Sequence, residues 1–142
     1  MIKPLLVAVN SVTIKGSAVN RQYRRGAYMQ GVKDLLGKPF SEEKCWELCQ
    51  DLYRRNGYEL PFYGDLHFEG SSIMYGDKPI MKETKLPLHG CLCLYDLKGH
   101  GIDHVAVYVG CNQIFHATKG AGACIEKYSK YLPRLKGMYI YG

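Results

Sequence analysis

The stretch that decides the fold is Ser41-Glu42-Glu43-Lys44-Cys45-Trp46-Glu47-Leu48-Cys49-Gln50-Asp51-Leu52-Tyr53. Its apolar residues recur at the spacing of one helix face, which predicts an amphipathic helix lying on a core. Ser41 is a favourable N-cap, the glutamates suit the positive end of a helix, and Gly57 is well placed to end it. The predicted helix therefore carries Cys45 near its first turn.

Cys45 allows two interpretations. The positive end of the helix dipole favours a thiolate and lowers the pKa of a thiol placed there, whereas the neighbouring glutamates raise that pKa. Cysteine is also among the residue types that are most often buried. From this helix alone, a core cysteine is a better prediction than a nucleophile.

Length and composition predict a single folded domain. The chain has 142 residues, of which 46% are hydrophobic and 23% are charged. This length is enough for a hydrophobic core, and the composition is too apolar for a disordered chain. No apolar run approaches the ~20 residues that a membrane span needs. The first nine residues resemble the start of a signal peptide, but the run breaks at Asn10 without a clear cleavage site, so we predict a strand.

The net charge of +6 suits an anionic partner such as a nucleic acid or a cell-wall polymer. No nucleic-acid motif accompanies this charge, so we expect no nucleic-acid partner. The six cysteines come without a convincing secretion signal, which favours reduced thiols over a disulfide framework.

The helices of the chain are predicted to lie in its first half. Residues 4–14 are predicted to form a strand, residues 15–26 a basic loop or the start of a helix, and residues 27–36 a short helix that precedes the Cys45 helix. Eight prolines and glycines lie between residues 57 and 90, and they predict little regular structure there.

The second half is predicted to be a meandering antiparallel sheet. Five short β-prone runs are separated by glycine-bearing turns: residues 92–95, 104–109, 113–117, 124–127 and 138–141. Helices first and a sheet second indicate an α+β domain. We predict one domain over residues 1–142, with residues 1–26 as an N-terminal extension.

Two histidines of the predicted sheet could lie close together. His104 and His116 flank Gly110-Cys111-Asn112, a segment typical of a hairpin turn. A turn centred on Gly110 would place the histidines opposite each other, whereas a shift of half a residue would put them on opposite faces of the sheet. Each histidine alone is most simply a hydrogen-bonded sheet residue.

Together with Cys45, the two histidines suggest nucleophilic catalysis. A thiol nucleophile needs a base that takes its proton, and the base needs a partner that orients it. Cys45, His104 and His116 would supply these groups in that order. Backbone N–H groups at the helix start, including that of Cys45, could stabilise an oxyanion.

These segments resemble the NlpC family of papain-like cysteine peptidases, which cut peptide cross-bridges in bacterial cell walls. The family's helix opens with Asp-Cys-(Ser or Trp)-Gly-Leu-Val, where this chain has Lys44-Cys45-Trp46-Glu47-Leu48-Cys49. The family's sheet carries His-Val-Gly-Ile-Tyr-Val-Gly and Ile-His-Ala, where this chain has His104-Val105-Ala106-Val107-Tyr108-Val109-Gly110 and Ile114-Phe115-His116-Ala117. The resemblance extends from about Ala27 to the end of the chain.

The resemblance implies a papain-like α+β fold, with N-terminal helices packed on an antiparallel sheet, and a cysteine peptidase that needs no cofactor. Its substrates would be peptidoglycan stem peptides. Cys45 would attack an amide carbonyl, His104 would take the thiol proton and later protonate the leaving amine, and His116 would orient His104. Trp46 and Phe40 would support the cleft around the oxyanion.

The tryptophan after the cysteine is most similar to versions of the family found among phage tail proteins. This implies a tail-associated cell-wall hydrolase that is made in the host cytoplasm and located in the virion tail, with other tail proteins as partners. A location in the bacterial cytoplasm or cell envelope is the alternative.

The chain departs from the family pattern next to the cysteine. Lys44 replaces the usual acidic residue, Glu47 replaces a glycine, and Phe40 stands where the family has a tyrosine. Lys44 could favour the thiolate, whereas Phe40 removes a hydrogen-bonding group near the oxyanion. An alternative function is therefore a structural or assembly component of a phage tail, with the same fold and a weak or inactive site.

A zinc site is a third interpretation. Cys45 with Cys49, or Cys91 with Cys93, could join a histidine as ligands. None of these pairs has the CxxC spacing that is usual for structural zinc, so we expect no metal.

Overall fold

The computed structural model describes residues 29–41 and 44–141. Two α-helices come first in these residues, α3 (Val32–Leu35) and α4 (Cys45–Arg55). The helix predicted over residues 27–36 is thus found only as the single turn α3. The strand predicted over residues 4–14 and the loop over 15–26 lie outside the described residues.

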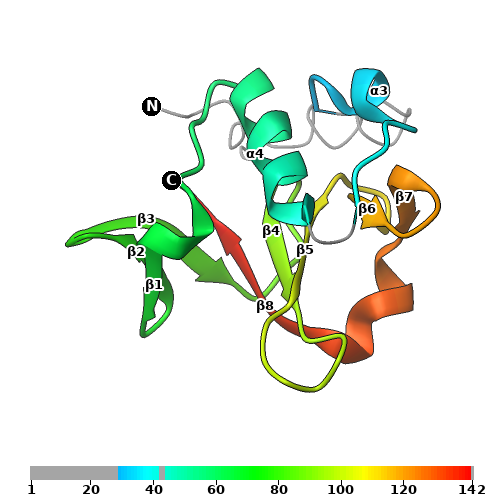
Figure 1. Cartoon of the computed structure of the whole chain (residues 1–142). Coiled ribbons are helices and arrows are strands. Elements are labelled where there is room, and N and C mark those ends of the chain that lie inside the picture. Colours follow the sequence, from blue (N-terminus) through cyan, green and yellow to red (C-terminus); the bar gives the residue numbers. More distant parts are fainter. Residues whose placement is uncertain (1–28, 42–43, 142) are drawn as a thin grey trace.

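Eight strands and two 3₁₀ helices follow the helices (Figure 1). The strands are β1 (Leu66–Glu69), β2 (Ser72–Tyr75), β3 (Lys78–Thr84), β4 (Leu92–Tyr95), β5 (His104–Tyr108), β6 (Gln113–Thr118), β7 (Gly122–Lys127) and β8 (Leu135–Ile140). The 3₁₀ helix η2 (Tyr63–Asp65) precedes β1, and η3 (Tyr128–Arg134) connects β7 to β8.

The eight strands form one sheet in the order β1-β2-β3-β8-β4-β5-β6-β7. All neighbours are antiparallel. The predicted α+β class is therefore confirmed, with helices before an antiparallel sheet. β8 lies between β3 and β4, so it joins the β1–β3 meander to the β4–β7 meander (Figure 1). None of the helices in the described ranges has the length and apolar character to span a membrane.

Helix α4 packs its apolar face on the sheet, as its spacing predicts. Leu48, Cys49, Leu52 and Tyr53 are completely buried in the core cluster that also includes residues of β5 and β6. The hydroxyl of Tyr53 donates a hydrogen bond to the carbonyl oxygen of Gly90 at 2.7 Å. This packing holds α4 against β5 and β6.

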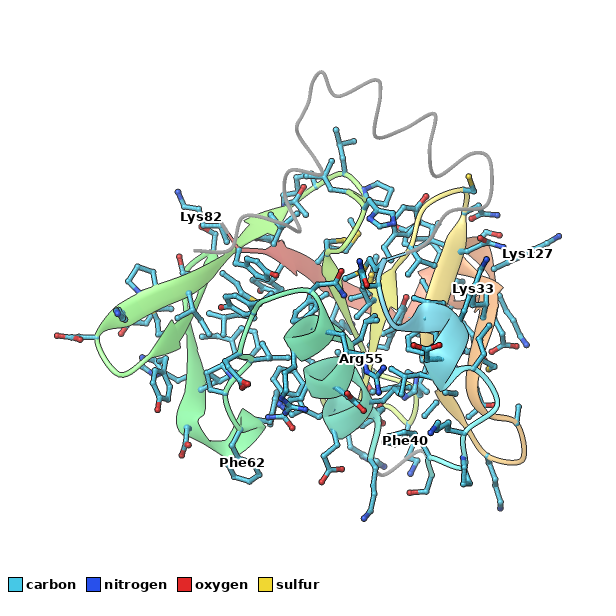
Figure 2. All side chains as sticks on the ribbon, turned by 90° about the horizontal axis from the view of Figure 1, so that it is seen from above. Lys33, Phe40, Arg55, Phe62, Lys82 and Lys127 are labelled. Atoms are coloured by element: carbon cyan, nitrogen blue, oxygen red, sulfur yellow. The ribbon has the colours of Figure 1, made fainter. Side chains whose placement is uncertain are left out.

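Basic side chains extend from the outside of this core. Figure 2 shows Lys82 on β3 and Lys127 on β7 pointing away from the body of the molecule, on opposite sides of it. These two lysines, one on the inner strand β3 and one on the edge strand β7, thus carry their charges on the surface of the molecule rather than within the helix–sheet core.

The predicted start of the central helix is wrong, and its predicted end is confirmed. Helix α4 begins at Cys45 with Lys44 as N-cap and without a side-chain cap. Ser41 does not cap the helix, and its carbonyl oxygen accepts the backbone N–H of Lys44 at 3.0 Å. Gly57 ends the helix with a φ of +86°, which glycine adopts without a Cβ penalty. Cys45 is therefore the first residue of the α-helix, directly after Lys44, which has a 3₁₀ conformation.

The prediction of little regular structure between residues 57 and 90 is also wrong. β1, β2 and β3 occupy this stretch as a meander. Gly70 and Gly76 lie in its two turns, with φ of +59° and +64°, so these glycines mark hairpin turns rather than irregular chain. Pro79 lies at an irregular point of the β2–β3 ladder, where a missing N–H is tolerated.

Candidate active site

The hairpin of β5 and β6 brings the two histidines together. Cys111 and Asn112 occupy the centre of its turn with φ of +51° and +60°, the backbone of a type I′ turn. The pairs Val107↔Phe115 and Tyr108↔Ile114 centre the hairpin on Cys111, one full residue beyond Gly110. A shift by a full residue keeps His104 and His116 on one face, displaced along the strands rather than directly opposite.

Hydrogen bonds run from His104 through His116 to Glu126. His104 Nε2 lies 2.8 Å from His116 Nδ1, and His116 Nε2 lies 2.8 Å from Glu126 Oε1. His116 is only 1% exposed. On β7, Cys124 faces His116, and Glu126 follows two residues later on the same face.

Sequence reasoning missed Glu126. The run that contains it was recognised as a strand, but the pairing of that strand with β6 was not predicted. Alternate residues of a strand lie on the same face of the sheet. Once Cys124 is placed opposite His116, Glu126 is therefore expected on the same face as Cys124.

Glu126 is held as a carboxylate. Burial alone would raise its pKa, but hydrogen bonds from Lys130, Tyr131 and His116 outweigh burial and lower the pKa to about 2. Lys130 Nζ lies 2.6 Å from Oε2, and the Tyr131 hydroxyl lies 2.8 Å from Oε1. Because a carboxylate only accepts hydrogen bonds, the proton between Glu126 and His116 belongs to His116 Nε2.

This assignment determines where the other ring protons lie. With a proton on Nε2, a neutral His116 presents Nδ1 as an acceptor, so His104 donates from its own Nε2. Burial and the neighbouring His116 lower the pKa of His104 to about 4. Near pH 7 the His104 ring is therefore neutral, and its Nδ1 is the unprotonated nitrogen that can act as a base.

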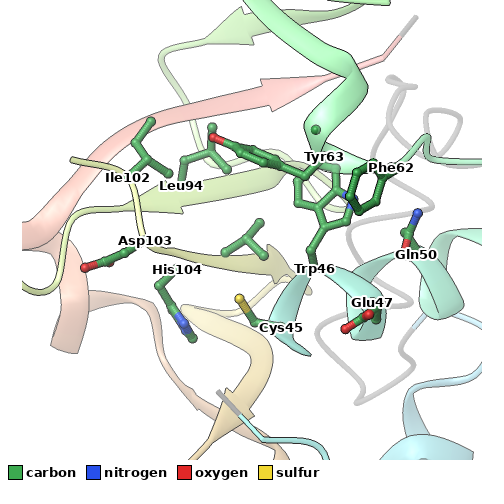
Figure 3. Close-up of a pocket in the computed structure, with 12 residues that line it drawn as sticks. Cys45, Trp46, Glu47, Gln50, Phe62, Tyr63, Leu94, Ile102, Asp103 and His104 are labelled. Carbon is green, nitrogen blue, oxygen red and sulfur yellow. The ribbon is translucent and has the colours of Figure 1, made fainter. Parts of the chain in front are cut away.

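Cys45 and His104 line the same pocket, which has a volume of about 430 Å³. The two side chains are 8% and 4% exposed. Figure 3 shows the Cys45 sulfur and the His104 ring next to each other at one end of this pocket. Cys45 also opens α4, where backbone N–H groups are not used within the helix and can face an oxyanion.

Trp46 forms part of the pocket wall. Its ring meets that of Tyr63 edge to face at 5.0 Å, and its Nε1–H donates to the Pro61 carbonyl at 3.0 Å. One turn later, Gln50 Nε2 donates to the carbonyl of Leu60 at 3.0 Å. Helix α4 thus fixes the segment of residues 60–65, which supplies another wall of the pocket.

Phe40 occupies a different place. It is partly buried and packs against the main core, and the residues that line the pocket do not include it. The structure therefore brings Cys45, Trp46 and His104 to one pocket, with His116 behind His104, and leaves Phe40 outside the lining.

One group of side chains has a spacing that a metal ion could use. The ligand atoms of His116, Cys124 and Glu126 lie within 4.8 Å of one another. However, the ammonium group of Lys130 lies 2.6 Å from Glu126, and its charge opposes a cation there. This group is better explained by the hydrogen bonds that orient His116.

We expect the free energy of unfolding to fall by about 2 kcal/mol between pH 7 and pH 5 because of His104. Its folded pKa of about 4 lies below the ordinary value of 6.5, so the unfolded chain binds more protons in this window and stability is lost as the pH falls. Urea unfolding at both pH values measures the change. The variant His104→Gln cannot titrate and should lack this part of the pH dependence. An equal pH dependence in both proteins would contradict the prediction.

Comparison with known proteins identifies a matching family and solved structures with a similar fold, one of which is described below. The model of the NlpC/P60 family matches residues 19–135. The chain is also similar to a solved structure from Staphylococcus aureus subsp. aureus Mu50, a protein similar to a lipoprotein of the NLP/P60 family, with 18% identity and a TM-score of 0.48. The match covers 98% of this chain and 54% of that chain, so this chain spans about half the length of that relative. None of the curated proteins matches the chain.

Proposed function

Because the chain belongs to the NlpC/P60 family, whose members are cell-wall peptidases, we propose that it is a cysteine peptidase that hydrolyses amide bonds in peptidoglycan peptides. We call Cys45 and His104 the catalytic pair. The observation that carries this proposal is that both residues line the same pocket. A thiol beside a neutral imidazole, at the start of a helix, is the arrangement that thiol-dependent amide cleavage needs.

In the first half of the reaction, His104 Nδ1 takes the thiol proton and the Cys45 sulfur attacks the amide carbonyl carbon. A C–S bond forms, and the carbonyl electrons move to oxygen, where the N–H groups at the start of α4 stabilise the negative charge. The imidazolium then gives its proton to the leaving amine as the C–N bond breaks. The product is a thioester on Cys45.

In the second half, His104 removes a proton from a water molecule that attacks the thioester. The C–S bond breaks, the thiol regains its proton from His104, and the peptide leaves with a new carboxyl group.

His116 and Glu126 act as positioning residues in this scheme. When His104 becomes cationic, its Nε2–H still donates to His116 Nδ1, and His116 donates in turn to the Glu126 carboxylate. The negative charge of Glu126 thereby stabilises the imidazolium through the intervening ring. Burial keeps His104 neutral until the thiol proton arrives, because it lowers the pKa of His104.

A digest of purified peptidoglycan tests the proposal. Wild-type protein should release peptides with new amino groups, which mass spectrometry of the soluble products identifies. Cys45→Ala should release none, whereas Cys111→Ser, which removes an exposed thiol in the β5–β6 turn, should match the wild type. Equal release by Cys45→Ala, or no release by the wild type, would overturn the proposed function.

The location is a separate proposal. The likeness of Cys45-Trp46 to the sequences of phage tail proteins supports a tail-associated hydrolase in the virion. A second candidate function, an assembly component of the tail, is favoured by Lys44 and Glu47, which replace an acidic residue and a glycine of the family pattern. A phage that carries Cys45→Ala separates the two: an assembly component predicts normal tails and normal infection, whereas a hydrolase predicts normal tails that penetrate the cell wall poorly.

A further inference from the structure

The two outer strands of the sheet, β1 and β7, differ in how their outer edges are covered. At β7, Gly37 donates its backbone N–H to the carbonyl of Ala123 at 2.8 Å, and Ala123 donates to the carbonyl of Lys38 at 3.0 Å. At β1, three of the four residues are exposed, and β2 is the strand on its inner side (Figure 1). Within the described residues, β1 therefore presents an open edge to which another strand can add.

The backbone of Phe68 points to this open edge. Glu69 and Ser72 pair across the two-residue turn that joins β1 to β2, and the backbone groups of paired residues alternate between the two sides of a strand. The carbonyl of Ser71 accepts the N–H of Glu83 from β3 at 2.7 Å, so Ser71 faces β3 and the next residue, Ser72, faces β1. Glu69 is thus hydrogen-bonded to Ser72. The N–H and C=O of Phe68, one residue earlier, point away from β2.

The side chains of β1 alternate between the two faces of the sheet. Phe68 lies on the core side, with its ring 5.7 Å from the ring of Tyr139. His67 and Glu69 lie on the other face, where His67 Nε2 is 3.5 Å from Glu69 Oε2 and the two side chains are 49% and 66% exposed. The open edge therefore carries an imidazole and a carboxylate at equal distances from Phe68 along the strand.

A second copy of β1 fits this edge in one register. Opposite residues of an antiparallel pair lie on the same face, so a symmetric pairing centres on a residue, here His67, Phe68 or Glu69. Centred on Phe68, the two copies of Phe68 exchange both backbone hydrogen bonds, and each His67 lies opposite Glu69 of the other copy. Centred on His67, Asp65 would lie opposite Glu69, and centred on Glu69, two glutamates would lie opposite each other. Like charges in directly opposite positions are unfavourable.

We propose that β1 is a dimerisation edge, at which two copies of this chain join through antiparallel β1 strands centred on Phe68. The two pairs of His67 with Glu69 fix the register, and the two sheets become one continuous sheet. The twofold axis is perpendicular to this sheet, so both copies of α4 lie on the same face of it.

The dimerisation edge is separate from the catalytic pair. None of residues 65–69 lines the pocket, so dissociation of the dimer should leave the labelling of Cys45 unchanged. Failure of the dimer would likewise leave the proposed peptidase function in place. We expect a dissociation constant on the order of 100 µM, because a ladder of this length buries less surface than the ~1,200 Å² of a standard interface.

Sedimentation equilibrium with charge exchange tests the register, with a reductant present because the thiol of Cys111 is exposed. His67→Glu places like charges opposite each other twice and should raise the dissociation constant at least about tenfold. The double variant His67→Glu, Glu69→His exchanges the two groups and should restore the constant to within about threefold of the wild type. The matched control is His100→Glu, the same substitution in the exposed loop between β4 and β5, which should leave the constant unchanged.

Substitution of Phe68 tests the backbone ladder. Phe68→Pro removes the N–H that points to the open edge and should leave a folded monomer, because the β1–β2 ladder does not use that N–H. Phe68→Ala keeps the N–H and should still dimerise, and circular dichroism checks that both variants fold. Equal dissociation constants in Phe68→Pro and Phe68→Ala would overturn the ladder.

Two further outcomes would overturn the proposal even if Phe68→Pro does not fold. One is a wild-type chain that stays monomeric at about 1 mM, ten times the expected constant, which would leave the edge to a strand of a different protein. The other is a double variant that dimerises as weakly as His67→Glu, which would show that the pairs of His67 with Glu69 do not set the register.

Discussion

Alkylation of Cys45 by iodoacetamide is expected to slow about 30-fold at pH 7 and about 300-fold at pH 6 when His104 is replaced by alanine. A thiol with the ordinary pKa of ~8.5 is about 3% thiolate at pH 7 and about 0.3% at pH 6. A thiol that passes its proton to the neutral His104 ring as it attacks the reagent does not depend on that fraction. Peptide cleavage should fall further, by about 10²–10⁴, because His104 also protonates the leaving amine. Rates of labelling at Cys45, followed by peptide mass spectrometry, measure the effect.

A second histidine provides the matched control. His67 on β1 is exposed, lies 3.5 Å from Glu69, and does not line the pocket. His67→Ala should therefore label at the wild-type rate. The thiol–imidazole pair is ruled out if His104→Ala keeps the fast labelling, or if Cys45 of the wild type is labelled only after denaturation.

Glu126→Ala is expected to lower kcat/KM for peptide cleavage about 10- to 100-fold, the loss of one charge-assisted hydrogen bond worth about 1.5–3 kcal/mol. Without this carboxylate, His116 has no fixed tautomer and the imidazolium of His104 loses its counter-charge. Glu126→Gln should cost less, about 10-fold, because an amide oxygen can still accept the His116 Nε2–H. Steady-state kinetics on a defined stem peptide measure both variants.

Lys130 offers a control on the same carboxylate. Lys130→Gln removes the donor to Oε2 and leaves the contact of Oε1 with His116 in place. The pKa of Glu126 should rise, since the hydrogen bond from Lys130 lowers it, while kcat/KM at pH 7 stays within about twofold. The melting temperatures of the variants distinguish a loss of folding stability from a loss of His116 positioning. Equal losses in Lys130→Gln and Glu126→Ala would show that the network serves only stability.

The strands of the second half could be predicted because their signals are local. β4 has the predicted bounds, β5, β6 and β7 overlap the predicted runs to within two residues at either end, and β8 begins three residues before its predicted run. Each run is rich in β-branched or aromatic residues and ends at a glycine-bearing turn, so its conformation depends little on distant residues. The pairing of Cys45 with His104 was proposed from residue type and spacing, and the structure places both in one pocket.

The remaining features depend on contacts between distant parts of the chain. Glu126 meets His116 only through the register of β6 and β7, which no local pattern specifies. The pocket wall in residues 60–65 requires this segment to be tied to α4 by Trp46 and Gln50. The sequence does not distinguish Gly70 and Gly76 in hairpin turns from glycines in an irregular loop, because the two look alike until the partner strand is known.

The central place of β8 has a consequence for biosynthesis. β8 pairs with β3 on one side and β4 on the other, and no other pairing joins β1–β3 to β4–β7 in the described sheet. Both meanders therefore leave the ribosome with an unpaired edge, which stays open to association with other chains until residues 135–140 emerge. Strand closure should then be a late event that follows the emergence of residues 135–140, and nascent chains arrested before residue 135 should be sensitive to proteases and bound by chaperones.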